Sequence, residues 1–178
     1  DKDQVKNGLV CASAGNHAQG FAVSCSTLGY KGVVYMPITT PNQKIQQVKK
    51  FGKNNIEVIL FGENFTKAYE KALEECRKYN KIFIHPFDDI NVITGQATVF
   101  YEILNQSKLN LDYLFIPIGG GGLISGAINV FKQLSPDTKI IGIEPMGAPS
   151  MSKSIKNNKL TILDKIDGFV DGVAVKKV

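Results

Sequence analysis

The sequence predicts an α/β protein whose mainly parallel sheets lie in two lobes of three layers each, and three observations lead to this fold class. Short β-branched runs alternate along the chain with segments in which apolar residues recur at helical spacing. The connections between these segments are short, as they are where helices join parallel strands. Two of the strand-to-helix turns are rich in glycine, which is typical of ligand sites in such folds.

The first half of the chain predicts four strands separated by three helices. The helix expected over residues 40–52 has the clearest ends, with Thr40 as its N-cap, Pro41 at its first position and Gly52 at its end. The expected strands cover residues 9–13, 32–38, 56–61 and 82–86, and the expected helices cover residues 17–29, 40–52 and 64–79.

The second half continues the alternation after the segment His85–Asp89. The expected helices cover residues 88–107 (interrupted at Gly95), 123–134 and 150–158, and the expected strands cover residues 111–118 and 138–145. We therefore place a boundary near His85–Asp89 and expect two lobes. Residues 1–87 would form one lobe and residues 88–178 the other.

Composition excludes several classes of protein. Of the 178 residues, 43% are hydrophobic and 21% are charged, as in ordinary globular proteins. No apolar run approaches the roughly 20 residues of a membrane span, and the polar N-terminus is unlike a signal peptide, so we expect a cytoplasmic protein without a membrane partner. The three cysteines are odd in number and lack metal-like spacing, which is typical of buried thiols in a reducing compartment.

The net charge of +5 does not indicate a nucleic-acid partner. It comes almost entirely from scattered lysines, because Arg77 is the only arginine. Arginine forks and basic stripes interleaved with aromatic residues are the usual features of nucleic-acid surfaces, and neither occurs here. A solvated lysine surface explains the charge, and we expect no nucleic acid among the partners.

Four successive glycines separate the strand expected over residues 111–118 from the helix expected over residues 123–134. Each glycine costs about 0.5–1 kcal/mol in regular structure, so four between two apolar elements indicate a specific need. Their backbone amides can surround an anion at the start of a helix, whose dipole favours negative charge. The run lacks both the G-K-[ST] and the G-x-G-x-x-G patterns of nucleotide sites, which favours a single phosphate. A flexible loop or tight packing is the alternative.

The second glycine-rich turn is SAGNHAQG, residues 13–20. Ser13 can cap a helix or bind a carboxylate, and Gly15 allows a ligand to approach the backbone closely. The side chain of Asn16 both donates and accepts hydrogen bonds, which suits a phenolic oxygen. His17 could move a proton, but a lone histidine in a helix more often has a structural role, and we expect that role here.

Six motifs, in this order along the chain, resemble those of the pyridoxal-phosphate-dependent threonine dehydratases: SAGNHAQG, MPITTPNQKI, HPFDD with GQAT, PIGGGGLISG, IIGIEP and DGVAV. That family has the tryptophan-synthase-β-like fold (fold type II), and the first two motifs look most like its biosynthetic members. The resemblance implies pyridoxal 5'-phosphate as cofactor. It also implies deamination of L-threonine to 2-oxobutanoate and ammonia, the first step of isoleucine biosynthesis.

The resemblance also implies roles for the two lobes and for individual residues. Residues 1–87 would form the small lobe, which binds cofactor and substrate, and residues 88–178 would form part of the large lobe. Asn16 would contact the phenolic oxygen of the cofactor ring, and the Asp171–Gly172 pair would line the cofactor site. The phosphate would be bound by Gly119, Gly120, Gly121, Gly122 and the amide of Leu123. The substrate carboxylate would be bound by Ser13, Ala14, Gly15, Asn16 and His17.

Two departures from the family pattern concern a possible metal and one helix. Glu144, Ala148 and Ser150 resemble positions that hold a cation in some relatives. Metal-binding relatives carry an acid at the third of these positions, where this chain has Ser150. Whether the protein binds a metal therefore stays open. Ala97 stands where many members have glycine, and we expect little functional consequence from this change within a helix.

Two functional segments of the family have no counterpart in the sequence. The Schiff-base lysine of the family lies in an S-F-K-x-R-G-A-like motif before SAGNH, and the serine that meets the pyridine nitrogen lies after DGVAV. We therefore expect an internal part of a longer enzyme, inactive by itself, with the catalytic lysine upstream and no catalytic residue in this chain.

Two other interpretations stay open. One is a serine dehydratase or racemase of the same fold, and the other is a non-catalytic module that binds a phosphorylated ligand. For the full-length enzyme we expect a homo-oligomer whose small-molecule substrate is L-threonine or L-serine.

Overall fold

The computed structural model describes residues 4–107 and 110–178. The chain divides into two compact units, Asp1–Pro86 and Phe87–Val178. This division lies one residue before the boundary placed from the sequence. The interpretation of the two units as a cofactor and substrate lobe and as part of a larger lobe stays a prediction.

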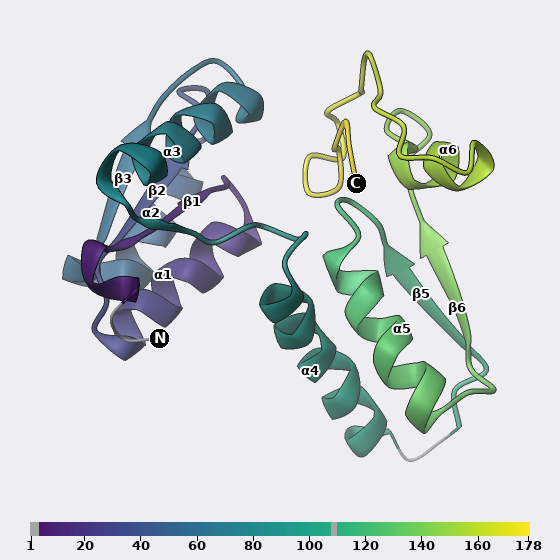
Figure 1. The fold of residues 1–178 in the computed structure, drawn as a ribbon. Coiled ribbons are helices and arrows are strands. Elements are labelled where there is room, and N and C mark those ends of the chain that lie inside the picture. Colours follow the sequence, from purple (N-terminus) through teal and green to yellow (C-terminus); the bar gives the residue numbers. More distant parts are fainter. Residues whose placement is uncertain (1–3, 108–109) are drawn as a thin grey trace. The chain divides into compact units, whose positions relative to one another are not determined.

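Unit 1 is built around a parallel sheet of four strands (Figure 1). The strand order is β3-β2-β1-β4, so that β1 is flanked by β2 and by β4. The elements are β1 (Leu9–Ala12), α1 (Asn16–Leu28), β2 (Gly32–Met36), α2 (Asn42–Gly52), β3 (Ile56–Leu60), α3 (Phe65–Tyr79) and β4 (Ile82–Phe83), with short 3-10 helices at Gln4–Asn7 and Lys53–Asn55.

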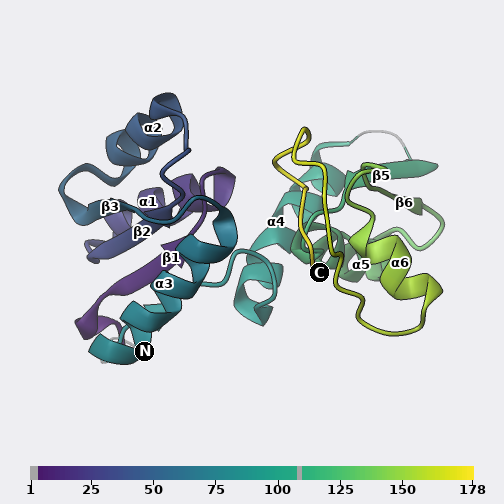
Figure 2. The same ribbon diagram turned by 90° about the horizontal axis from the view of Figure 1, so that it is seen from above.

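Helices cover both faces of this sheet (Figure 2). Alternate residues of β1 point to opposite faces, and Cys11 packs with Phe21 of α1 and Val48 of α2 in one core. On the other face, Val10 packs with Ala68 and Ala72 of α3 in a second core. Unit 1 therefore has the three layers that the sequence predicted.

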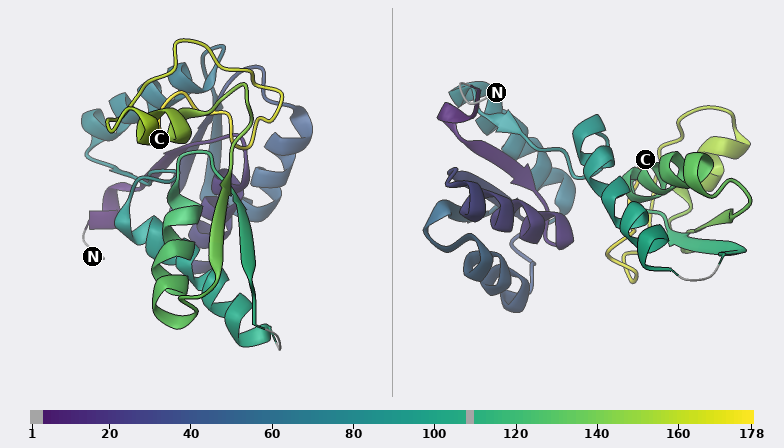
Figure 3. Two further views of the ribbon diagram at one scale, coloured as in Figure 1. Left: turned by 90° about the vertical axis from the view of Figure 1, so that its right-hand side faces the viewer. Right: turned by 90° about the horizontal axis from the view of Figure 1, so that it is seen from below.

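Unit 2 contains a parallel pair of strands with two helices on one face (Figure 3). Its core contains Phe100 of α4, Ile116 of β5 and Phe131 of α5. An ideal Cβ on Gly126 of α5 would lie 2.7 Å from the backbone nitrogen of Ala97 in α4, so the two helices approach closely there. The elements are α4 (Ile90–Gln106), β5 (Tyr113–Pro117), α5 (Gly122–Leu134), β6 (Lys139–Ile143) and α6 (Ser150–Lys156).

The opposite face of the β5–β6 pair carries exposed apolar side chains. Phe115 is 65% exposed and Ile143 is 48% exposed, and Tyr113 and Ile141 lie on the same face. Parallel sheets are normally covered on both faces. The described residues of unit 2 therefore form one helical layer and one sheet layer, instead of the three layers expected for this lobe, because no described helix covers the second face of the sheet.

All but one of the expected element ends lie within two residues of the observed ends, and two expectations, the N-cap of α2 and the end of β4, were wrong. Pro41 rather than Thr40 is the N-cap of α2, because the carbonyl of Pro41 accepts the first helical hydrogen bond, from the amide of Ile45, while the amide of Thr40 belongs to a preceding turn with Pro37. β4 ends at Phe83, three residues before the expected end, although the amide of Ile84 still donates to the carbonyl of Val10. Within residues 4–107 and 110–178, no helix is both long and apolar enough to cross a membrane.

Candidate functional site

The turn that follows β1 lies where the order of the strands in the sheet of unit 1 reverses. The chain proceeds from β1 to β2 and β3 on one side, and then returns to place β4 on the other side of β1. In open parallel sheets, ligands bind at the carboxyl ends of the strands that flank such a point. Here those ends are the turn Ser13–Gly15 after β1 and the segment that follows Phe83.

The first turn of α1 has backbone amides without protein acceptors. The N-cap is Gly15, which has no side chain to accept a hydrogen bond, and the first turn holds no acidic residue. No oxygen of the described residues accepts a hydrogen bond from the amides of Asn16, His17 or Ala18. Such a helix start attracts an anion through its free donors and the positive end of the helix dipole.

Ser13, Gly15 and Asn16 leave the same turn accessible to a ligand. The amide of Gly15 donates to the hydroxyl oxygen of Ser13 over 3.1 Å, which leaves the hydroxyl hydrogen of Ser13 able to donate elsewhere. An ideal Cβ on Gly15 would meet no atom within 4 Å, so the space beside this residue is open. Asn16 is exposed, and its side-chain amide contacts no hydrogen-bond partner among the described residues.

His17 connects the first turn of α1 to the end of β4. Its Nε2 lies 3.0 Å from the carbonyl oxygen of Ile84, and a carbonyl can only accept, so Nε2 carries the proton. Burial lowers the pKa of His17 below its usual 6.5, and positive charge at His85 lowers it further, against the opposite effect of the Ile84 carbonyl. The imidazole is therefore neutral at pH 7. Its hydrogen bond joins the start of α1 to the segment after β4, at the point where the strand order reverses.

The glycine run of unit 2 forms a second helix start with unoccupied donors. Gly121 is the N-cap of α5, with no side-chain cap and no acidic residue in the first turn. The amide of Ser125 donates to the carbonyl of Gly121 over 3.0 Å. In the part of the chain that the structure describes, no oxygen accepts a hydrogen bond from the amides of residues 119–124. These amides can therefore bind an anion such as a phosphate.

The four glycines are surrounded by other parts of unit 2. An ideal Cβ on Gly120 would lie within 3.0 Å of the ring of Phe87, and one on Gly122 would lie 2.8 Å from the carbonyl oxygen of Phe87. Gly121 has a φ of +91°, which side-chain-bearing residues rarely adopt. Tight packing, offered above as an alternative to a phosphate site, thus accounts for part of the glycine content. The residue that sequence reasoning missed is Phe87.

The segment near the C-terminus approaches the same loop. An ideal Cβ on Gly119 would lie 3.1 Å from Cα of Val173 and 3.6 Å from the carbonyl oxygen of Gly172. The structure thus brings the DGVAV motif beside the first glycine of the run. Asp171 and Gly172 are exposed, and their role at a cofactor stays a prediction.

The three residues that resemble a cation site lie between the end of β6 and the first residue of α6. The carboxylate of Glu144 accepts the amides of Met151 over 2.7 Å and of Ser152 over 2.8 Å, as well as the Ser152 hydroxyl, so both of its oxygens are engaged. Ala148 and Ser150 are buried nearby along the chain. Among the described residues, no three His, Cys, Asp or Glu side chains gather to hold a metal ion. The question whether the protein binds a metal, which the sequence left open, stays open.

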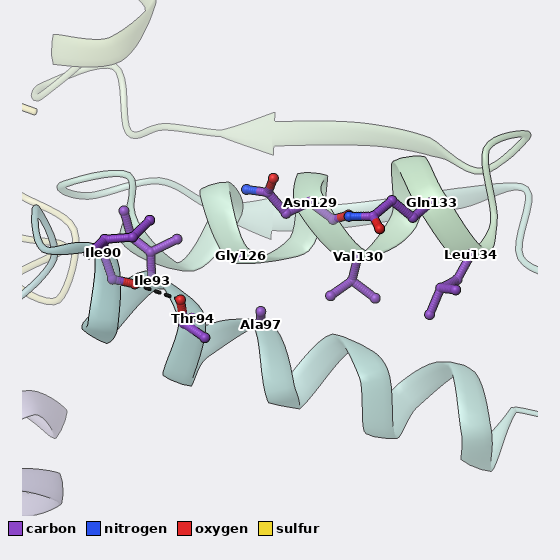
Figure 4. A pocket seen from close by; sticks show the side chains of 9 residues that line it. All are labelled: Ile90, Ile93, Thr94, Ala97, Gly126, Asn129, Val130, Gln133 and Leu134. Atoms are coloured by element: carbon purple, nitrogen blue, oxygen red, sulfur yellow. Dashed lines mark hydrogen bonds between the residues drawn. The ribbon is translucent and has the colours of Figure 1, made fainter.

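A separate groove of about 360 Å³ lies between α4 and α5 (Figure 4). Its polar side chains are engaged with their own helices: the hydroxyl of Thr94 donates to Ile90, the amide of Asn129 to Ser125, and the amide of Gln133 to Asn129. The remaining lining is mostly aliphatic. This groove contains no titratable side chain and offers no chemistry of its own.

The family model described as pyridoxal-phosphate dependent enzyme matches residues 2–178. The chain belongs to this family. The match covers both units and both glycine-rich turns, and it confirms the family expected from the six motifs, together with its cofactor.

Curated relatives in this family carry names consistent with that resemblance. An L-threonine dehydratase, biosynthetic type, from Halalkalibacterium halodurans is 55% identical over 177 residues, which are 99% of this chain and 43% of the relative. The protein of the same name from Bacillus subtilis is 52% identical over 176 residues, 99% of this chain and 42% of the relative. The chain thus spans less than half the length of these relatives.

Solved structures support the fold class. The processed form of threonine deaminase isoform 2 from Solanum lycopersicum has a TM-score of 0.93 and 44% identity, and the match covers 100% of this chain and 51% of that one. Maize serine racemase has a TM-score of 0.89 and 30% identity, and the match covers 98% of this chain and 52% of that one. The predicted α/β fold with parallel sheets is therefore confirmed.

Proposed function

We propose that the full-length protein is an L-threonine ammonia-lyase that uses pyridoxal 5'-phosphate and forms 2-oxobutanoate and ammonia, as the first step of isoleucine biosynthesis. The observation that carries this proposal is the 55% identity, over 99% of the chain, to a relative named as a biosynthetic L-threonine dehydratase. A 52% identical relative bears the same name. The donor groups at the starts of α1 and α5 support the proposal independently.

The start of α5 fits the phosphate of the cofactor. The amides of residues 119–124 are donors without acceptors among the described residues, and no carboxylate in the first turn opposes an anion. We assign the phosphate contacts to Gly119–Gly122 and to the amide of Leu123. When bound, pyridoxal phosphate withdraws electrons from the α-carbon of an amino acid and so makes its proton acidic. The chain's own contribution is to bind and orient.

The start of α1 fits a carboxylate and a phenolic oxygen. The amides of Asn16 and His17 and the hydroxyl of Ser13 are donors that the described residues leave available, and the open space at Gly15 allows a ligand to approach. We assign these groups, with Ala14, to the substrate carboxylate. The side-chain amide of Asn16 can donate to a phenolic oxygen of the cofactor ring and so orient the ring.

The proposal is tested by incubating the full-length protein with pyridoxal phosphate and L-threonine and measuring 2-oxobutanoate and ammonia. Release of both products in equal amounts is expected. Cofactor binding without any product from L-threonine or L-serine would contradict the proposal and favour the non-catalytic module.

A pair of matched variants tests the site assignment. Asn16 and Asn42 are each the first residue of a helix, and both are exposed. Asn16→Ala should lower kcat/KM for L-threonine by about 30-fold or more, because a donor to the ring is lost. Asn42→Ala, which removes only an acceptor for the Gln46 amide, should leave kcat/KM within about twofold. Equal effects from the two variants would contradict the assignment of Asn16.

A serine racemase or dehydratase is the second candidate. The observation that favours it is the similarity to maize serine racemase, with 30% identity across 98% of the chain. Formation of D-serine from L-serine, at a higher kcat/KM than formation of 2-oxobutanoate from L-threonine, would favour the racemase. A chiral separation of the amino acid, run beside the 2-oxo-acid assay, distinguishes the two.

A further inference from the structure

Of the atoms that an ideal Cβ on the four glycines Gly119–Gly122 would meet, the nearest belong to Phe87. An ideal Cβ on Gly120 would fall within 3.0 Å of Cγ, Cδ1 and Cδ2 of the Phe87 ring. An ideal Cβ on Gly122 would lie 2.8 Å from the carbonyl oxygen and 3.0 Å from Cα of the same residue. The ring of Phe87 therefore takes the place of a side chain at residue 120, and its backbone takes the place of one at residue 122.

Phe87 lies two residues before the N-cap of α4. Asp89, two residues later, caps this helix, because its Oδ1 accepts the amides of Asn91 over 2.8 Å and of Val92 over 3.2 Å. The helix is in turn fixed against α5, where Gly126 approaches the backbone of Ala97. Phe87 therefore precedes a helix, α4, that packs against α5, and Phe87 itself lies against the first turn of α5.

We propose that Phe87 is a positioning residue that holds the run Gly119–Gly122 in the conformation needed to bind the cofactor phosphate. A run of four glycines has more conformational freedom than any other sequence, and ordering it on binding would weaken the affinity. Contact with Phe87 orders the run before any ligand arrives. The claim about the phosphate rests on the proposed function, whereas the claim about the loop conformation does not.

This role makes a specific prediction about glycine substitutions. Gly120→Ala places a methyl group into the Phe87 ring and should weaken pyridoxal phosphate binding at least about tenfold. In Phe87→Ala the ring is gone, so Gly120→Ala should cause no further loss in that background. Gly122→Ala is the matched control, because its nearest neighbours are the backbone oxygen and Cα of residue 87, which Phe87→Ala keeps. Its effect should persist in both backgrounds.

Three measurements on the full-length protein test the proposal. The first is the dissociation constant of pyridoxal phosphate for wild type, the single variants and the two double variants. The second is amide hydrogen exchange of residues 119–123 without cofactor, relative to the amides in the middle of α5. The third is the free energy of unfolding. Phe100→Ala serves as the control for a lost core ring, because Phe100 is 4% exposed and packs against Phe131 in the same unit.

We expect Phe87→Ala to accelerate exchange at residues 119–123 about tenfold or more relative to the middle of α5, and Phe100→Ala not to do so. Equal relative exchange in both variants would overturn the proposal. So would a loss from Gly120→Ala that is as large in the Phe87→Ala background as in wild type. If the wild-type protein binds no pyridoxal phosphate, the proposed function fails, and the exchange experiment still decides the role of Phe87.

Discussion

Helices α1 and α5 begin in the same way, but the backbone and the surroundings of their glycine N-caps differ. Each has 13 residues, follows a parallel strand, and has a glycine N-cap with no side-chain cap and no acid in its first turn. By contrast, Asn64 caps α3 by accepting the amide of Lys67, and Asp89 caps α4. The helix starts that we assign to ligands are thus among those that the protein leaves uncapped.

The two N-cap positions favour glycine for different physical reasons. Gly15 has a φ of −124°, which any residue can adopt, and its surroundings are open. Gly121 has a φ of +91°, and a Cβ there would lie 3.0 Å from the Cε methyl of Met151. A glycine before a helix can therefore indicate space for a ligand or a backbone that only glycine adopts easily. The predictions below separate these two causes.

The largest expected effect is that of a carboxylate at the start of α1. Gly15→Asp should cap the helix and stabilise the protein by about 0.5–1 kcal/mol, while its charge occupies the donors proposed for the substrate. We expect kcat/KM for L-threonine to fall about 100-fold. Steady-state kinetics and urea unfolding measure the two effects.

Two controls accompany Gly15→Asp. Gly15→Asn caps without charge and should lose less activity, whereas Asn64→Ala removes the cap of α3 and should lose about 1 kcal/mol of stability with unchanged kinetics. Retained activity in Gly15→Asp would show that the substrate does not bind at these amides.

The next largest effect is that of strain at the start of α5. Gly121→Ala should lower the free energy of unfolding by about 1–2 kcal/mol, because alanine is strained at a positive φ. Gly168→Ala is the control, since a Cβ there meets no atom within 4 Å and its φ is not in the positive range. Thermal unfolding followed by circular dichroism compares the two, and equal stabilities would contradict the conformational explanation for Gly121.

A smaller effect is expected for the corresponding change in α1. Gly15→Ala loses some N-cap preference but also reduces the entropy of the unfolded chain, so the free energy of unfolding should change by no more than about 0.5 kcal/mol. The new methyl group enters the open space beside the turn. We therefore expect KM for L-threonine to rise about tenfold at nearly constant kcat. A stability loss as large as that of Gly121→Ala would remove the distinction between the two glycines.

The sequence was sufficient to predict the order of elements and the two turns, because both are local. The alternation of β-branched and helical segments yields every strand and long helix that the structure shows in the described residues. Errors occurred at element ends, where a competing local bond decides the outcome. Thr40 was expected to cap α2, but it lies in a turn that begins at Pro37, and the first helical hydrogen bond is accepted by the carbonyl of Pro41.

The contact between Phe87 and the glycine run could not be predicted in the same way. It joins residues 33 positions apart, and no periodic pattern or turn signal connects them. The only sequence signal was the position of Phe87 between a proline and the Asp89 cap in HPFDD. The assignments of Ser13, Asn16 and Gly119–Gly122 to ligands stay predictions until the variants are measured.

The smallest expected effect is a pH dependence of the free energy of unfolding that arises at the start of α1, through His17, and not at the start of α5. Burial lowers the pKa of His17 in the folded protein below 6.5, whereas the unfolded chain keeps about the usual value. As the pH falls below about 6.5, the unfolded chain therefore binds a proton that the folded protein does not, and stability decreases. The slope from this group is at most about 1.4 kcal/mol per pH unit, and it vanishes above about pH 7.5.

The test compares wild type with His17→Gln in urea unfolding between pH 5 and pH 8. Glutamine can still donate to the Ile84 carbonyl but does not titrate. The free energy of unfolding of the variant should therefore fall less steeply below about pH 6.5 than that of wild type. His85→Gln, measured in parallel, accounts for the other histidine of the chain. If wild type and His17→Gln lose stability equally on acidification, His17 is not held neutral by burial, and the link between α1 and β4 needs another explanation.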